Sequence, residues 1–295
     1  MQYCNTFAAF QSFQGNTFRR KGRGLVLDAL SVTNTLEKNI KILETPRVQF
    51  LYFHHIFKDE VANFEKLVHF LAKDHIFITH SEAVNRITEN NIDRPYITWS
   101  SDDGIWNNML AAEVLNRYGA SCCFYVNPYS IGLTDNYSIK RFCKEKLDIP
   151  PVQFLNWDDL NTLQKQGHEI GNHTYDHSMV SQLSLENFAA NFNKAHDELI
   201  ANCDKIVHFA YTYGKFEHFN KAAYDFVFEQ GYDSCTSAVR GCHINGLNEL
   251  SKNKLFLRRD QIIGNWPLEH IKYFMIQSAA KAHFSNNFLP ETYLG

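Results

Sequence analysis

The chain has 295 residues, a length that fits two domains or one large α/β barrel. Charged residues make up 21% of it and hydrophobic residues 44%, so the chain can bury a core, and a disordered or fibrous protein is excluded. The formal net charge of −3 includes no basic excess, and we expect no nucleic-acid partner.

Three features of the sequence predict a cytoplasmic protein. No apolar run approaches the ~20 residues of a membrane span. Residues 1–24 lack the basic start and the apolar stretch of a secretory signal. The seven cysteines are an odd number with no CxxC pair, which favours free thiols in a reducing compartment over zinc–thiolate ligands.

Residues 1–45 are expected to form an N-terminal extension, partly packed or mobile, ahead of one catalytic domain over residues 46–295. The hydrophobic periodicity of the extension is weak, and its cationic residues are clustered. The cluster consists of Arg19, Arg20, Lys21 and Arg23. We interpret it either as a solvated arm or as a patch that meets phosphate or makes peripheral contact with an anionic membrane.

From residue 47 onward, strand-like and helix-like segments alternate. The strand-like segments are short, apolar and β-prone, and the helix-like ones place apolar residues at a spacing of three or four. The predicted strands are 48–53, 95–101, 120–126, 168–171, 205–211 and 254–257. The predicted helices are 61–73, 106–118, 157–166, one capped by Ser184, 220–230 and 268–282. This alternation favours an α/β fold with a mostly parallel sheet or barrel.

Polar clusters follow three of the predicted strands, where parallel α/β folds build their active sites. Asp102 and Asp103 are adjacent, so they leave the strand on opposite sides and can take separate roles, although Asp-Asp-Gly alone is most often a turn. His173 and His177 are four residues apart, a spacing that puts both imidazoles on one side of a helical turn. One carboxylate and two imidazoles would make a three-ligand site with open positions for water and substrate.

These residues lie in motifs that resemble those of the polysaccharide deacetylases, the carbohydrate esterases with a NodB homology domain. The stretch WDDLNTLQKQGHEIGNHTYDH over residues 157–177 is similar to the family's helix, strand and His-x-x-x-His motif. SSDDG resembles the first motif, Thr-Phe-Asp-Asp-Gly, and FAYTYG resembles the third. The segment 123–127, CFYVN, and the opening FHHI at 53–56 are also similar to the family, and the resemblance spans about residues 48–275.

The resemblance implies a distorted (β/α) barrel and a metal-dependent hydrolysis of an N-acyl amide on a sugar. Asp103, His173 and His177 would hold the metal, and Asp102 would be the general base. The backbone N–H of Tyr213 would face the developing oxyanion. The expected ion is zinc, and the mixed nitrogen and oxygen ligands also admit Co²⁺, Ni²⁺ or Mn²⁺.

The chain departs from the family pattern at several positions. Ala210 occupies the slot of the arginine that orients the base, and Arg258 or Arg259 could reach in instead, with Arg258 taken as the catalytic candidate. The fourth motif is not evident, and the fifth motif's Leu-x-His, the usual general acid, has only the string Leu268-Glu269-His270. The candidates for the general acid are His54, placed first, and His55, His243 and His270. The residues expected to bind substrate are Tyr211, Tyr125 and Trp106.

The predicted function is a cytoplasmic sugar N-deacylase of surface-polysaccharide or O-antigen biosynthesis. Its substrate would be an amino sugar on a nucleotide or polyprenyl diphosphate carrier, with acetyl and formyl both open as the acyl group. One alternative is a glycan-binding or scaffold protein that has lost turnover, since the arginine and acid motifs are altered. Another is a metal-dependent hydrolase of a small amide that is not a sugar.

Overall fold

The computed structural model describes residues 3–13, 17–34, 41–246 and 254–284. In these residues a parallel sheet of nine strands forms the centre of the molecule. The strands are β1 (Arg47–Phe53), β2 (Ile76–Phe77), β3 (Pro95–Ser101), β4 (Cys122–Val126), β5 (Glu169–Asn172), β6 (His208–Ala210), β7 (Ser234–Thr236), β8 (Leu255–Leu257) and β9 (Arg259–Gln261). Their order is β8-β7-β6-β5-β4-β3-β1-β9, and β2 pairs with β3 outside this path.

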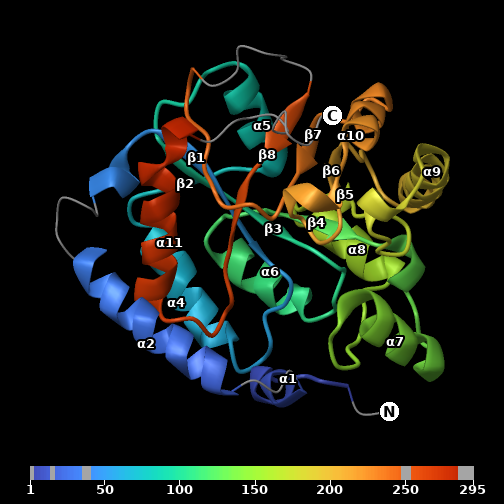
Figure 1. Ribbon diagram of the computed structural model, residues 1–295, viewed down its shortest axis with the longest axis horizontal. Coiled ribbons are helices and arrows are strands. Elements are labelled where there is room, and N and C mark those ends of the chain that lie inside the picture. Colours follow the sequence, from blue (N-terminus) through green and yellow to red (C-terminus); the bar gives the residue numbers. More distant parts are fainter. Residues whose placement is uncertain (1–2, 14–16, 35–40, 247–253, 285–295) are drawn as a thin grey trace.

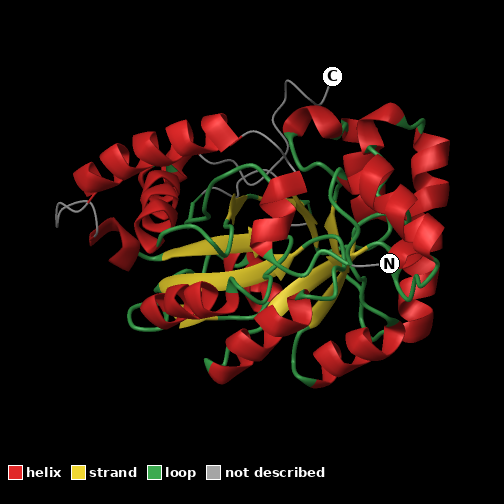
Figure 2. Ribbon diagram, turned by 90° about the horizontal axis from the view of Figure 1, so that it is seen from below, coloured by secondary structure: helices red, strands yellow, loops and turns green. Residues whose placement is uncertain are grey.

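The sheet is nearly closed into a barrel. Strands β8 and β9 stand at the two ends of the strand order, yet only Arg258 separates them in the chain. Next to this seam, His243 forms an antiparallel bridge with Val48 of β1. Helices surround the strands (Figure 2). The predicted distorted (β/α) barrel is therefore confirmed.

The helices are mostly those that the periodicity predicts. They are α1 (Phe7–Phe13), α2 (Thr17–Asn34), α4 (Val61–Leu71), α5 (His80–Thr88), α6 (Asn108–Arg117), α7 (Asn136–Phe142), α8 (Trp157–Lys165), α9 (Leu185–Asn202), α10 (Lys221–Glu229) and α11 (Leu268–Ala280) (Figure 1). Ser184 caps α9 by accepting the N–H of Asn187, as predicted, and the apolar stripe of α4 is buried. Helices α1, α2, α5 and α7 and the short strands β2, β7 and β9 were not expected.

The N-terminal helices pack against the rest of the molecule. Asp59 accepts the N–H of Phe7 at the start of α1, and the ring of Phe10 lies 4.6 Å from that of His55. Helix α2 lies beside α11, where Asp28 Oδ1 and His270 Nε2 are 2.7 Å apart. We refer to α1 and α2 together as the N-terminal arm. The division of the chain at residue 45 stays a prediction.

Two further expectations concern the whole chain. All seven cysteines lie among the described residues and are free, as predicted. Among the described helices, none combines the length and apolar character that crossing a bilayer requires.

Candidate active site and metal centre

Three side chains converge beyond the carboxyl ends of β3 and β5. Asp103 Oδ1 lies 3.5 Å from His173 Nε2 and 3.4 Å from His177 Nε2. All three side chains are buried, and their donor atoms lie within 4.8 Å of one another. In the described part of the chain this is the one group of three or more histidine, cysteine or acidic residues that could hold a metal ion. The sequence-predicted ligands are therefore brought together.

The backbone around these ligands is unusual. Asp103 has a φ of +73°, Thr174 of +65° and His177 of +57°, values that residues other than glycine rarely adopt. The two histidines therefore do not lie on a helical turn, as their spacing suggested, but in a loop with two left-handed residues. Asn127 fixes this loop, because its side-chain amide donates to the carbonyl oxygens of His173 and Thr174.

Hydrogen bonding gives His173 a defined role. Its Nδ1 lies 2.6 Å from the carbonyl oxygen of Ala210, which can only accept, so Nδ1 carries the proton. The lone pair of the neutral ring is then on Nε2, the nitrogen that faces Asp103. Asp103 Oδ1 and His177 Nδ1 have no hydrogen-bond partner within the described residues.

This donor set fits a divalent metal. Two imidazole nitrogens and a carboxylate oxygen are common zinc ligands, and ligands about 2.1 Å from a tetrahedral ion lie roughly 3.4 Å apart. The separations of 3.4 and 3.5 Å from Asp103 Oδ1 to the two nitrogens match that edge. A buried carboxylate oxygen that lacks a hydrogen-bond donor also requires a cation.

Asp102 has a separate environment, as its position next to Asp103 predicted. Arg259 of β9 donates two 2.8 Å hydrogen bonds to it, one to each carboxylate oxygen. Burial raises the pKa of Asp102, but the charge and hydrogen bonds of Arg259 outweigh burial and hold the pKa below its ordinary value. Asp102 is thus an ionised carboxylate held in one orientation beside the three donors.

The arginine that holds Asp102 is Arg259, so the choice of Arg258 was wrong. Arg259 belongs to β9 and also donates hydrogen bonds to Ser237 O and Ser100 Oγ. Its guanidinium carbon lies 4.3 Å from the centre of the Tyr52 ring. Arg258 lies between β8 and β9, and since successive side chains of extended chain alternate in direction, its guanidinium points away. It lies over the ring of Phe216, 5.1 Å from the ring centre.

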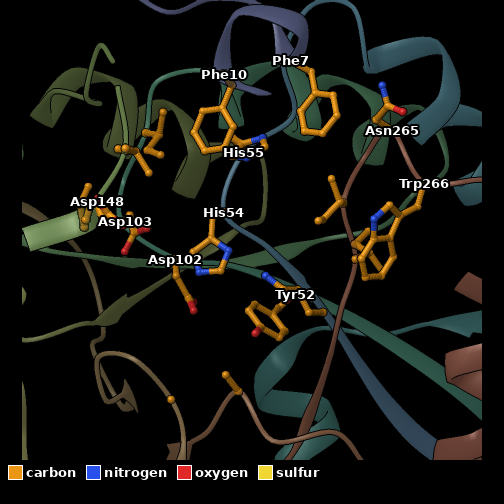
Figure 3. Close-up of a pocket in the computed structure, with 18 of the residues that line it drawn as sticks. Phe7, Phe10, Tyr52, His54, His55, Asp102, Asp103, Asp148, Asn265 and Trp266 are labelled. Carbon is orange, nitrogen blue, oxygen red and sulfur yellow. The ribbon is translucent and has the colours of Figure 1, made fainter. Parts of the chain in front are cut away.

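The site opens into a cavity of about 1040 Å³ that extends to the N-terminal arm. Its lining includes Asp102, Asp103, His173 and His177, and also Phe7, Phe10 and Leu27 of the arm. Figure 3 shows His54 beside the two aspartates, with Phe7 and Phe10 above His55.

Of the three residues predicted to bind substrate, only Tyr211 lines the cavity. Its hydroxyl donates to Gly214 O. Tyr125 is fully buried, and its hydroxyl bonds with His80 and Thr236, because the side chain points into the barrel interior. Trp106 is 37% exposed and lies outside the cavity lining. Tyr213 lines the cavity with its ring centre 4.9 Å from that of His177, and its φ of +63° resembles that of the metal-site residues.

The four candidate proton donors differ in whether they line the cavity. His54, His55 and His270 line the cavity, whereas the fully buried His243 does not. Glu60 lies 3.3 Å from Nδ1 of His55, and Asp28 binds His270. Burial lowers the pKa of His54, although Asp103 and Asp102 act in the opposite direction.

The fold and the site together place a metal-binding donor set at one edge of the barrel. A nearly closed parallel barrel carries a buried carboxylate and two imidazoles at its carboxyl-terminal edge, next to a second carboxylate that is ionised and oriented. Such a donor set could hold a divalent ion with positions left open for water and substrate.

The family model described as "Polysaccharide deacetylase" matches residues 89–233, and this segment belongs to the polysaccharide deacetylase family. The resemblance found in the motifs is therefore confirmed. The family supports an amide-hydrolysing deacetylase that acts on a sugar. No sequence among the curated proteins matches the chain.

Solved structures share the fold. The deacetylase PplD from Streptococcus pyogenes, in complex with acetate, is 15% identical with a TM-score of 0.58, and the match covers 80% of this chain and 98% of that one. IcaB from Ammonifex degensii is 17% identical with a TM-score of 0.60 and the same coverages. BC0361, a polysaccharide deacetylase from Bacillus cereus, is 17% identical with a TM-score of 0.62, over 79% and 69% of the two chains.

Proposed function

We propose that this protein is a metal-dependent N-deacylase of an amino sugar that is linked to a nucleotide or polyprenyl diphosphate. The observation that carries the proposal is the convergence of Asp103, His173 and His177 beside Asp102, which Arg259 orients. The acyl group is acetyl or formyl, and the product is the free amine. The proposed setting is the cytoplasmic part of surface-polysaccharide or O-antigen synthesis, supported by the free thiols.

The three convergent residues would hold the ion, with zinc as the first candidate and Co²⁺, Ni²⁺ or Mn²⁺ as alternatives. When bound, the ion would lower the pKa of a water molecule and polarise the acyl carbonyl. Asp102 accepts the proton of the attacking water, because its carboxylate is ionised. Arg259 is a positioning residue that keeps Asp102 charged and fixed.

The leaving amine needs a proton. Of the three candidate histidines that line the cavity, His54 is the one that Figure 3 shows beside both aspartates. We assign it to this step, so that Asp102 and His54 form a base and acid pair around the scissile bond. The N–H of Tyr213 is proposed to face the oxyanion, because Tyr213 projects into the cavity against His177.

The geometry of Arg259 argues against the alternative of an inactive glycan-binding protein. That alternative rests largely on the missing arginine of the third motif, and Arg259 reaches Asp102 from another strand. A binding module has no need for an oriented carboxylate beside a metal site.

The experiment is hydrolysis by the purified full-length protein loaded with Zn²⁺. N-acetyl and N-formyl amino sugars, free, on a nucleoside diphosphate and on a polyprenyl diphosphate, are incubated with it, and released acetate or formate is measured. The proposal expects acid release from at least one carrier-linked sugar, abolished in Asp102→Asn. Metal-loaded protein that releases no acid from any of them would contradict it.

A further inference from the structure

The N-terminal arm exposes large apolar side chains to solvent. Phe13 is 53% exposed, Leu25 71%, Val26 59% and Leu30 40%. These four are among the ten large hydrophobic residues that are exposed in the described part of the chain. Three of them belong to α2 and fall in one stretch of six consecutive residues, 25–30. A concentration of this kind marks an interaction surface, whereas isolated exposed hydrophobic residues do not.

The opposite side of α2 is already occupied. Leu27 and Ser31 are buried, Asp28 binds His270, and Ser31 donates to the carbonyl oxygen of Glu269. These positions recur at a spacing of three or four, so one stripe of the helix faces α11 and the other faces outward. Figure 1 shows α2 at the rim of the molecule, outside α11. The exposed residues of α2 therefore do not belong to the stripe that packs against α11.

The sequence of α2 indicates what kind of surface this helix meets. The first two turns of the helix carry four cationic residues in a chain whose net charge is −3. They are Arg19, Arg20, Lys21 and Arg23. Apolar residues next to a cationic cluster on one helix are the signature of a helix that lies in the interface of an anionic bilayer.

The arm also reaches the active site. Gly24, Leu27 and Asp28 of α2 line the same cavity as Asp103 and His173, together with Phe7 and Phe10 of α1. The helix that exposes Leu25 and Val26 on one side thus bounds the cavity on the other. A lipid lying under α2 would be next to the cavity.

We propose that the N-terminal arm docks the protein on an anionic membrane surface and brings the cavity to a substrate carried by a lipid embedded there. The inference rests on the proposed function for the nature of that substrate, and of the two carriers it favours polyprenyl diphosphate. Docking itself requires no turnover, so it can be tested separately.

The experiment measures sedimentation of the full-length protein with vesicles of phosphatidylcholine, alone or mixed with phosphatidylglycerol. We expect binding to the mixed vesicles only, and weakening with added salt. Leu25→Ser/Val26→Ser/Leu30→Ser and Arg19→Gln/Arg20→Gln/Lys21→Gln/Arg23→Gln should each reduce the partition coefficient about tenfold or more. The matched control is Leu185→Ser/Ile200→Ser on α9, whose side chains are 48% and 52% exposed, and it should bind as the wild type does.

Three results would overturn the proposal. One is equal binding to neutral and anionic vesicles, or none to either. Another is an equal loss of binding in the α9 control. The third is that the wild type forms a dimer, the triple serine variant is monomeric, and neither of them binds vesicles. A second copy of the chain would then cover the apolar surface.

A turnover measurement keeps this inference apart from the deacylase proposal. The triple serine variant should lose activity on a polyprenyl-linked sugar in vesicles and retain it on a sugar without a lipid. Vesicle binding without any hydrolysis would refute the deacylase and leave docking intact.

Discussion

The two ends of the barrel both pair buried histidines with carboxylates, but their chemistry differs. At the amino ends of β5 and β6, Glu169 accepts hydrogen bonds from the backbone of His80 and Ser81, and His208 bonds with Ser81 and Ser234. At the carboxyl ends, Asp103 Oδ1 and both Nε2 atoms face one another. Ionisable residues that satisfy one another build structure, whereas acceptors that converge without a donor define a site.

The largest effect is expected at the carboxyl end. Asp102→Asn keeps the shape of the side chain and removes its basicity, so turnover should fall by roughly 10²–10⁴-fold. Metal content should stay at the wild-type level, because Asp102 is bound to Arg259 and is not one of the three converging donors. Steady-state kinetics with elemental analysis checks both values. Near-normal turnover would mean that another group removes the proton.

Arg259 and Arg258 form a matched pair of neighbours with different surroundings. Arg259→Met leaves the buried Asp102 without its partner and should lower the free energy of unfolding by about 3–5 kcal/mol. Arg258→Met changes a side chain that bonds neither carboxylate oxygen of Asp102, and should cost less. Denaturant unfolding of both variants measures the difference. Equal losses of unfolding free energy in the two variants would show that the ion pair between Arg259 and Asp102 contributes nothing specific to stability.

Glu169 tests the amino end of the barrel. Burial raises its pKa, but His208, His80 and Ser81 lower it more, so that it falls to about 2 from an ordinary value of 4.5. A depressed pKa stabilises the folded state above about pH 4.5, and this stabilisation is lost as the pH falls towards 2. Glu169→Gln should therefore lower the free energy of unfolding by roughly 1–3 kcal/mol at neutral pH.

The measurement is denaturant unfolding at several pH values. The gap between wild type and Glu169→Gln should narrow below about pH 4.5. Turnover per folded molecule and metal content should be unchanged. A variant that folds normally but loses metal would show that the two ends are not separate in function.

The last prediction concerns the proton donor. His54→Ala should reduce turnover by about 10²-fold on an ordinary amide and less on a substrate with a better leaving group, which needs less protonation. His243→Ala is the control, because His243 lies outside the cavity lining. If His55→Ala or His270→Ala recovers on the activated substrate instead, the donor is that histidine.

Much of this contrast could be predicted from the sequence. The motifs SSDDG and HTYDH predict the three converging residues, because the first ends a strand of the parallel sheet and the second follows one. The choice between Arg258 and Arg259 could not be made, since it depends on the alternation of a three-residue strand that was not predicted. Tyr125 lies on β4, a strand that was predicted, but all five residues of this strand are buried, so the sequence does not tell which of its side chains line the cavity.

The N-terminal arm shows a different limit. Its apolar residues serve two opposite surfaces of α2, so the periodicity that marks an ordinary amphipathic helix is weakened. The contribution of Phe7, Phe10 and Leu27 to the cavity depends on contacts with residues far along the chain, such as His55. Nothing in the local sequence of the arm indicates those contacts.

The proposed chemistry requires that Asp103, His173 and His177 hold a metal ion at the carboxyl end of the barrel. This requirement is tested by elemental analysis of the wild type, His173→Ala and His177→Ala, purified in parallel with the control His208→Asn. We expect about one equivalent of divalent metal in the wild type and the control, and little in the two alanine variants. Unchanged metal content in both alanine variants, or a loss confined to the control, would contradict the claim.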